Sequence, residues 1–91
     1  MTEAPAKTAT IANPKGLHAR PSAAVAEIVG GYEARVLIGY RGEWEEADSI
    51  LGLLTLGACH GAEVAVSADG PQAEAAIAAV VSFLEQGVDK L

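Results

Sequence analysis

The sequence predicts an α+β fold, a two-layer sandwich in which helices cover one face of a sheet and the other face meets solvent. Two observations support it. Segments with strand-like alternation and segments with helical apolar periodicity follow one another in the order βαββαβα. The strand patterns keep one face polar, as in sheets that are covered on one side only. The same order is also compatible with a ferredoxin-like split βαβ unit.

The first strand and the first helix are separated by a loop. Residues 7–12 alternate, with Ala9 and Ile11 on one face, which indicates a strand. The sequence Asn-Pro-Lys-Gly at 13–16 is rich in residues that favour turns, so we expect a turn there. A helix is expected over 19–29, ended by the glycine pair at 30–31. Its apolar stripe consists of Pro21, Ala24, Val25, Ile28 and Val29, with Ser22 and Glu27 outside it.

A hairpin is expected next. Residues 32–40 alternate, and one face of this strand consists of Ala34, Val36, Ile38 and Tyr40. Arg41 and Gly42 are expected to form a two-residue turn. Residues 43–47 would return as a short edge strand, because three glutamates among five residues suit a solvated edge.

The last three elements have recognisable first and last residues. Ser49 is expected to cap a short helix over 50–56, which Gly57 ends. A strand over 63–68 would turn its two valines inward. Gly70 and Pro71 are expected to begin the last helix, with Pro71 at its first helical position. The core stripe of that helix consists of Ala73, Ile77, Val80, Val81 and Leu84, and Gly87 ends it.

The composition excludes several classes of protein. The 91 residues suit one domain over 7–91 after a flexible leader at 1–6. A net charge of −6 argues against nucleic acids and anionic membranes as partners. Because Cys59 is the only cysteine, no intramolecular disulfide or multi-cysteine metal site can form, and we expect no metal and no cofactor. No apolar run reaches the roughly 18–20 residues of a membrane span. The single cysteine leads us to expect a cytoplasmic protein, and we expect it to be a monomer.

The segment from Gly16 to Pro21 carries the candidate chemistry. It places His18 at the start of a helix, where free N–H groups and the helix dipole attract anions. A neutral imidazole is a good nucleophile near pH 7, and the Arg20 guanidinium can hold a phosphoryl group. Gly16 permits close backbone approach, while Pro21 is tolerated in the first turn and restricts Arg20. These residues together point to a histidine that handles phosphate.

Three segments together resemble the HPr family, the histidine-containing phosphocarriers of bacterial phosphotransferase systems. They are an active-site signature at 13–23, a regulatory-serine segment at 48–57, and a last strand and turn at 61–70, in the family's order and spacing. The resemblance implies an open-faced sandwich of four antiparallel strands covered by three helices, which the short helix at 50–56 favours over the ferredoxin-like alternative. It also implies that His18 accepts a phosphoryl group on Nδ1 from phosphorylated enzyme I. His18 would pass the group to a histidine of an enzyme IIA domain in sugar uptake, so the protein would be a carrier with a phosphohistidine intermediate and not an enzyme.

The resemblance further implies regulatory and partner-binding residues. Ser49 matches the serine that HPr kinase/phosphorylase modifies in many bacteria, so two roles stay open for it, helix cap and phosphoserine. The surface that meets enzyme I and enzyme IIA domains would include Leu17, Ile50, Leu51 and Leu54.

Two other functions stay open. One is an HPr-like regulatory phosphocarrier of a nitrogen-type phosphotransferase branch, which uses the same histidine chemistry. The acidic residues Glu27 and Asp48 stand where family members commonly carry basic ones, and they keep this function open. The other is a small α+β interaction domain without transfer chemistry, which leaves the segment around His18 unexplained. Trp44, on a polar strand, has no explanation in the sequence.

Overall fold

The structure is a computed structural model, and it describes residues 5–87. Its elements, in chain order, are β1 (Ala6–Thr10), α1 (Ala19–Gly30), β2 (Arg35–Tyr40), β3 (Glu43–Glu46), α2 (Ile50–Leu56), β4 (Glu63–Asp69) and α3 (Ala73–Gln86). The strands pair antiparallel in the spatial order β1-β4-β2-β3. This arrangement confirms the predicted α+β sandwich with the order βαββαβα.

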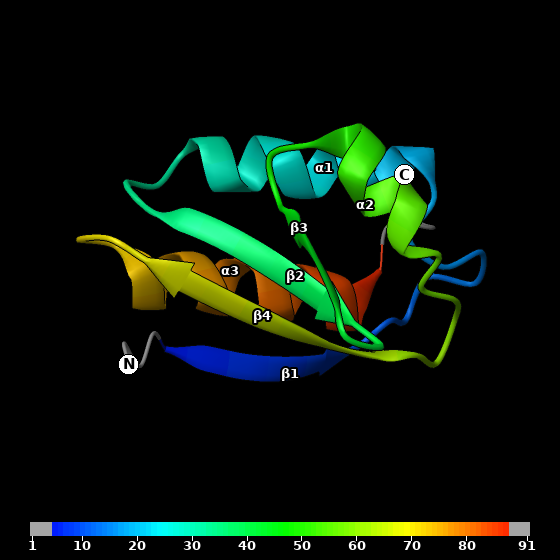
Figure 1. Ribbon diagram of the computed structural model, residues 1–91. Coiled ribbons are helices and arrows are strands. Elements are labelled where there is room, and N and C mark those ends of the chain that lie inside the picture. Colours follow the sequence, from blue (N-terminus) through cyan, green and yellow to red (C-terminus); the bar gives the residue numbers. More distant parts are fainter. Residues whose placement is uncertain (1–4, 88–91) are drawn as a thin grey trace.

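The helices lie on one side of the sheet, as Figure 1 shows. Helix α3 packs across β1 and β4, α1 packs against α3 and α2, and α2 packs against β3. In the part of the chain that the structure describes, no helix covers the opposite face of the sheet. The packing of α2 against α1 brings two segments together that are distant in the sequence, and both belong to the site described below.

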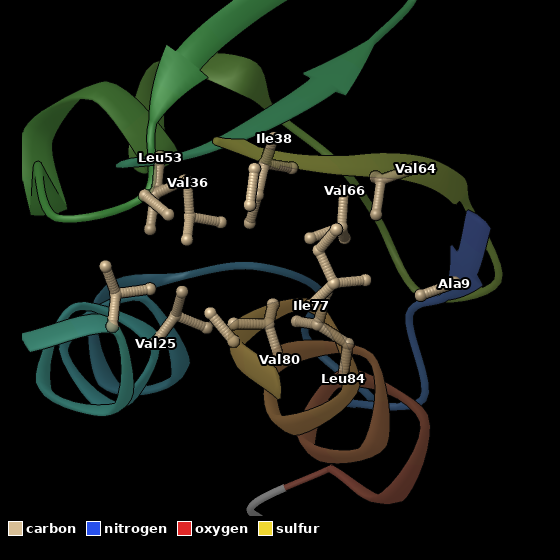
Figure 2. Close-up of a cluster of buried hydrophobic side chains, with 14 of the residues drawn as sticks. Ala9, Val25, Val36, Ile38, Leu53, Val64, Val66, Ile77, Val80 and Leu84 are labelled. Atoms are coloured by element: carbon tan, nitrogen blue, oxygen red, sulfur yellow. The ribbon is translucent and has the colours of Figure 1, made fainter. Parts of the chain in front are cut away.

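The core fills the space between the sheet and the helices. Alternate residues of β2 and β4 point inward, and four of them, Val36, Ile38, Val64 and Val66, are at most 2% exposed. Figure 2 shows these side chains facing a second set that comes from α1 and α3, with Leu53 of α2 beside Val36. The second set consists of Val25 of α1 and of Ile77, Val80 and Leu84 of α3. Removal of this apolar surface from water is the dominant stabilising contribution to the fold.

One interaction explains two differences from the predicted elements. The strand expected over 32–40 begins only at Arg35, and the last helix begins at Ala73 and not at Pro71. The reason is a reciprocal contact between the two segments. The Glu33 N–H donates to Gln72 Oε1 at 2.8 Å, and the Gln72 N–H donates to the Glu33 carbonyl at 3.0 Å. This contact takes Glu33 out of the sheet and makes Gln72 the residue before the helix.

The ends of β1 and β3 also differ from the prediction by one or two residues. Strand β1 begins at Ala6, within the expected leader at 1–6, whose residues 1–4 lie outside the described residues. It ends at Thr10, although the Ile11 N–H still donates to the carbonyl of Ala62, the next residue in the β1–β4 register. The Ala12 N–H then leaves the sheet and donates to the Leu84 carbonyl. Strand β3 ends at Glu46, although the Ala47 N–H still donates to the Val36 carbonyl at 2.8 Å.

Trp44 lies flat on the open face of the sheet, over a glycine. Gly39 and Trp44 are paired across β2 and β3, and a Cβ on Gly39 would stand 2.8 Å from three carbons of the indole. The two strands join through Arg41 and Gly42, whose φ angles of 54° and 83° match the tight hairpin turn that the sequence predicted. The indole therefore covers a stretch of backbone that glycine leaves bare, which is a known way to stabilise glycine within a strand.

Replacing Gly39 with alanine is expected to displace the indole, because the added methyl group has no room beneath it. We expect a loss of about 1–3 kcal/mol in the free energy of unfolding, typical of overpacking. Trp44 is the only tryptophan, so its fluorescence emission should shift to the red. Gly31→Ala is the control, because a Cβ there meets only one atom, at an ordinary 3.5 Å. Unchanged emission and stability in Gly39→Ala would contradict the packing described.

Candidate functional site

The loop before α1 is held against the segment that follows α2. Gly16 has a φ of +74°, and a Cβ at this position would stand 2.5 Å from the Ala58 carbonyl oxygen and 2.9 Å from the Cα of Cys59. The next residue completes the contact, since the Leu17 N–H donates to the Ala58 carbonyl at 2.9 Å. Only glycine satisfies both the positive φ and the close approach. The backbone around residue 16 is thereby fixed to a second part of the chain.

His18 is the residue that precedes α1 and caps its N-terminus. Its backbone is extended, with φ −91° and ψ −162°, and its carbonyl accepts the first helical hydrogen bond from the Ser22 N–H at 3.0 Å. The first N–H groups of a helix have no partner within it. In α1 these belong to Ala19 and Arg20, because Pro21 has none and no side chain among residues 5–87 caps the helix. The N–H groups next to the imidazole are therefore available to an anion.

The His18 ring is half-buried and meets one polar side chain within the described residues. Asn13 Nδ2 lies 3.4 Å from His18 Nε2, and the same nitrogen lies 3.5 Å from the Gly16 carbonyl oxygen. Asn13 is only 5% exposed, so its carboxamide sits beneath the ring and not in solvent. Arg20 is exposed and forms no ion pair among the described residues, so its guanidinium is available to a ligand. The ring is thus held from one side and open to a partner on the other.

Two side chains of this region are more buried than the sequence predicted. Leu17, which we expected on the partner-binding surface, is 4% exposed and belongs to the core, so its side chain is not part of that surface. Ser22, which we expected outside the apolar stripe, is completely buried. Burial is tolerated because the Ser22 hydroxyl donates to the Leu17 carbonyl at 3.4 Å. Pro21 is buried as predicted, so the first turn of α1 rests directly on the core.

An apolar surface on α2 lies beside α1. Ile50, Leu51 and Leu54 are 42%, 73% and 36% exposed, while Leu53 on the same short helix is completely buried. Figure 1 shows α2 alongside the first half of α1, and the two helices are in contact. Three large apolar side chains exposed on a seven-residue helix form a patch of the kind that marks an interaction site. We call these three residues the α2 patch.

Ser49 caps α2, as the sequence predicted. Its hydroxyl oxygen accepts a hydrogen bond from the Gly52 N–H at 3.0 Å, and Gly57 ends the helix in the left-handed conformation with φ 68°. The carboxylate of Glu45 lies against the same turn, since its Oε1 would be 2.6 Å from a Cβ on Gly52. The Glu45 carboxylate therefore places a negative charge near the N-terminus of α2, where it interacts favourably with the helix dipole.

Sequence reasoning missed the part that Asn13 plays. The sequence indicated only a turn at 13–16, and the turn is present, with the Gly16 N–H donating to the Asn13 carbonyl at 2.9 Å. Which way the side chain of a turn asparagine points depends on the surrounding structure, so the sequence offered no signal for its contact with the ring. Among residues 5–87 there is no cluster of three or more side chains suited to hold a metal ion. Nor does any described helix combine the length and apolarity that a bilayer span requires.

Comparison with known proteins places the chain in a family. The family model described as "PTS HPr component phosphorylation site" matches residues 5–86. The chain is 39% identical over 85 residues to the phosphocarrier protein NPr of Escherichia coli K12, covering 92% of this chain and 94% of that protein. It is 35% identical to the phosphocarrier protein HPr of Cupriavidus necator, covering 82% and 84%. The crystal structure of HPr-C-His from Thermoanaerobacter tengcongensis superposes with a TM-score of 0.85 at 33% identity, covering 90% and 92%.

Replacing Gly16 with alanine is expected to break the contact that fixes the loop. The methyl group would collide with the Ala58 carbonyl, and alanine disfavours a φ of +74°. We expect a loss of about 2–4 kcal/mol in the free energy of unfolding, from backbone strain and overpacking together. Gly57→Ala is the matched control, because Gly57 has a similar φ of +68° but nothing within 4 Å of a Cβ. Denaturant unfolding that gives equal losses for the two variants would contradict the importance of the contact.

Proposed function

This chain belongs to the HPr family of phosphocarrier proteins, and we propose that His18 is the residue that carries the phosphoryl group. Proteins of this family act with enzymes of the phosphotransferase system as carriers and not as catalysts. The observation that supports His18 most strongly is its place directly before α1, beside the free N–H groups of Ala19 and Arg20. Membership in the family also argues against the alternative of an interaction domain without transfer chemistry.

The surroundings of His18 suit a phosphohistidine. The phosphoryl group carries about two negative charges near neutral pH, and the two N–H groups and the Arg20 guanidinium are the complementary donors. In the proposed transfer, the bond between phosphorus and the donor's nitrogen breaks as a bond forms to a ring nitrogen of His18. The proton that His18 gives up balances the one that the donor's imidazole takes up. Phosphorylated enzyme I is the proposed donor, and a histidine of an enzyme IIA domain is the proposed acceptor.

The α2 patch is the proposed surface on which these enzymes dock. It lies on the helix that packs against α1, so a partner seated there also reaches His18. Burial of Ile50, Leu51 and Leu54 would contribute the apolar centre that most protein interfaces contain. Phosphorylation of Ser49 by an HPr kinase would place two further negative charges at the edge of this surface, next to Asp48, and would weaken the docking of acidic partners.

A second candidate function is the regulatory, nitrogen-type branch. The relatives named NPr from Escherichia coli K12 and Klebsiella oxytoca are 39% and 36% identical to this chain, while the HPr proteins of Cupriavidus necator and Vibrio cholerae are 35% and 34% identical. The acidic residues Glu27 and Asp48, both exposed, favour the same branch. Rates of phosphorylation by purified enzyme I of each branch, measured side by side, would assign the donor.

Incubation with labelled phosphoenolpyruvate and enzyme I tests the role of His18. We expect the wild-type protein to take one label that is labile in acid and stable in alkali, as a phosphoramidate is. His18→Ala should take no label, because the nucleophile is gone. His60→Ala is the matched control and should label like wild type, since His60 is exposed in the turn before β4. Label retained by His18→Ala at the wild-type rate, or lost from His60→Ala, would show that the assignment is wrong.

Arg20→Ala is expected to slow phosphoryl transfer more than it weakens binding of enzyme I. The guanidinium would act on charge that develops on the transferring group, and loss of one such donor typically lowers a rate by roughly 10²–10³-fold. Single-turnover rates and the affinity for enzyme I should be measured separately. The control is Arg41→Ala, which removes an arginine that stacks on Tyr40 at the hairpin turn. A folded Arg20→Ala protein with a wild-type transfer rate would exclude the role.

A further inference from the structure

A buried carboxamide faces the inner nitrogen of the His18 ring. Asn13 is 5% exposed, and its Nδ2 lies 3.4 Å from His18 Nε2. Of the two ring nitrogens, Nε2 is therefore the one turned toward the protein. Nδ1 is the nitrogen left for a phosphoryl group, which agrees with what the family resemblance implied.

The second contact of the same Asn13 nitrogen defines the direction of the hydrogen bond. Nδ2 also lies 3.5 Å from the carbonyl oxygen of Gly16, and a carbonyl oxygen can only accept. The amide group placed between the Gly16 oxygen and the ring is therefore the NH2 group, with one hydrogen for each. His18 Nε2 is then a hydrogen-bond acceptor and carries no proton. In the neutral, unphosphorylated ring the proton is therefore on Nδ1, and it leaves Nδ1 as the bond to phosphorus forms.

We propose that Asn13 is a positioning residue that keeps Nε2 of phosphorylated His18 free of its proton and so slows loss of the phosphoryl group to water. This inference rests on the proposed function of His18. In hydrolysis, a bond forms between a water oxygen and phosphorus, the bond between Nδ1 and phosphorus breaks, and the ring leaves with the electron pair. The ring leaves as neutral imidazole only if Nε2 has first taken up a proton. An amide donor that faces Nε2 opposes that protonation, because the two N–H groups would then point at each other.

Other ionisable side chains on the elements around the loop act equally in the wild-type protein and in the variants. Lys15 lies on the loop and Arg20 lies on α1. Cys59 and His60 belong to the segment between α2 and β4, and Glu85 belongs to the end of α3. A comparison that changes only residue 13 therefore separates the contribution of Asn13 from theirs.

The test measures the rate of hydrolysis of the phosphorylated protein between pH 5 and 9 for four proteins: wild type, Asn13→Ala, Asn13→Asp and Pro14→Asp. Asn13→Ala removes the donor, and Asn13→Asp replaces it with a carboxylate that favours a protonated Nε2. Loss of an ordinary hydrogen bond corresponds to a factor of about 2–10, so we expect Asn13→Ala to hydrolyse faster by that factor at neutral pH. Asn13→Asp should hydrolyse faster still. As the pH is lowered, its hydrolysis rate should begin to rise at a higher pH than the rate of wild type does. Pro14→Asp adds the same charge on an exposed neighbour and should stay close to wild type.

A measurement on the wild-type protein alone covers the case in which a variant fails to fold. The ¹⁵N shift of Nε2 in the phosphorylated protein should report uptake of the proton at a lower pH than in a phosphohistidine peptide. Uptake at the same or a higher pH overturns the inference, as do equal hydrolysis profiles for wild type and both Asn13 variants. A wild-type protein that takes label elsewhere than on His18 overturns the proposed function and this inference with it. Faster hydrolysis in Pro14→Asp equal to that in Asn13→Asp would also overturn it, because charge alone would then explain the effect.

Discussion

The close approach of two backbones, at Gly16 and at Ala58, determines where everything else in the site lies. The Leu17 N–H bonds to the Ala58 carbonyl at 2.9 Å, and Gly16 has no room for a side chain against the same carbonyl. Ala58 itself follows Gly57, the left-handed residue that ends α2. One junction therefore fixes the histidine at the start of α1 and the apolar helix α2 relative to each other. A partner docked on the α2 patch, as proposed, would meet His18 in a constant position.

Around this junction the protein presents hydrogen-bond donors and positive charge, although the chain as a whole is acidic. The chain has a net charge of −6, yet the start of α1 offers the N–H groups of Ala19 and Arg20, the Arg20 guanidinium and the nearby Lys15. On the inner side of the ring, Asn13 adds a neutral donor. These features suit a group that becomes more negative when it is phosphorylated. They also offer an acidic protein the donors and the positive charge that the proposed phosphoryl group on His18 would need.

Local signals in the sequence were sufficient for most of the fold. The turn at 13–16, the Ser49 cap and the Arg41-Gly42 hairpin depend on residues close in the chain, and the structure has each of them. The errors arose where distant segments meet. The bonds between Glu33 and Gln72 shortened a strand and delayed the last helix, and no pattern within either segment indicates them.

For the site, the sequence indicated His18 at the start of a helix, and this is where it lies. It did not indicate that Leu17 turns into the core or that Asn13 reaches the ring, because both depend on how the loop folds onto Ala58. Nuclear magnetic resonance of the phosphorylated wild-type protein tests the role of His18 most directly. If His18 carries the phosphoryl group, ³¹P should couple to a ring nitrogen of His18, and the largest backbone amide changes should occur at Ala19 and Arg20. Phosphorus on Ser49 or His60, or unchanged amide shifts at Ala19 and Arg20, would contradict it.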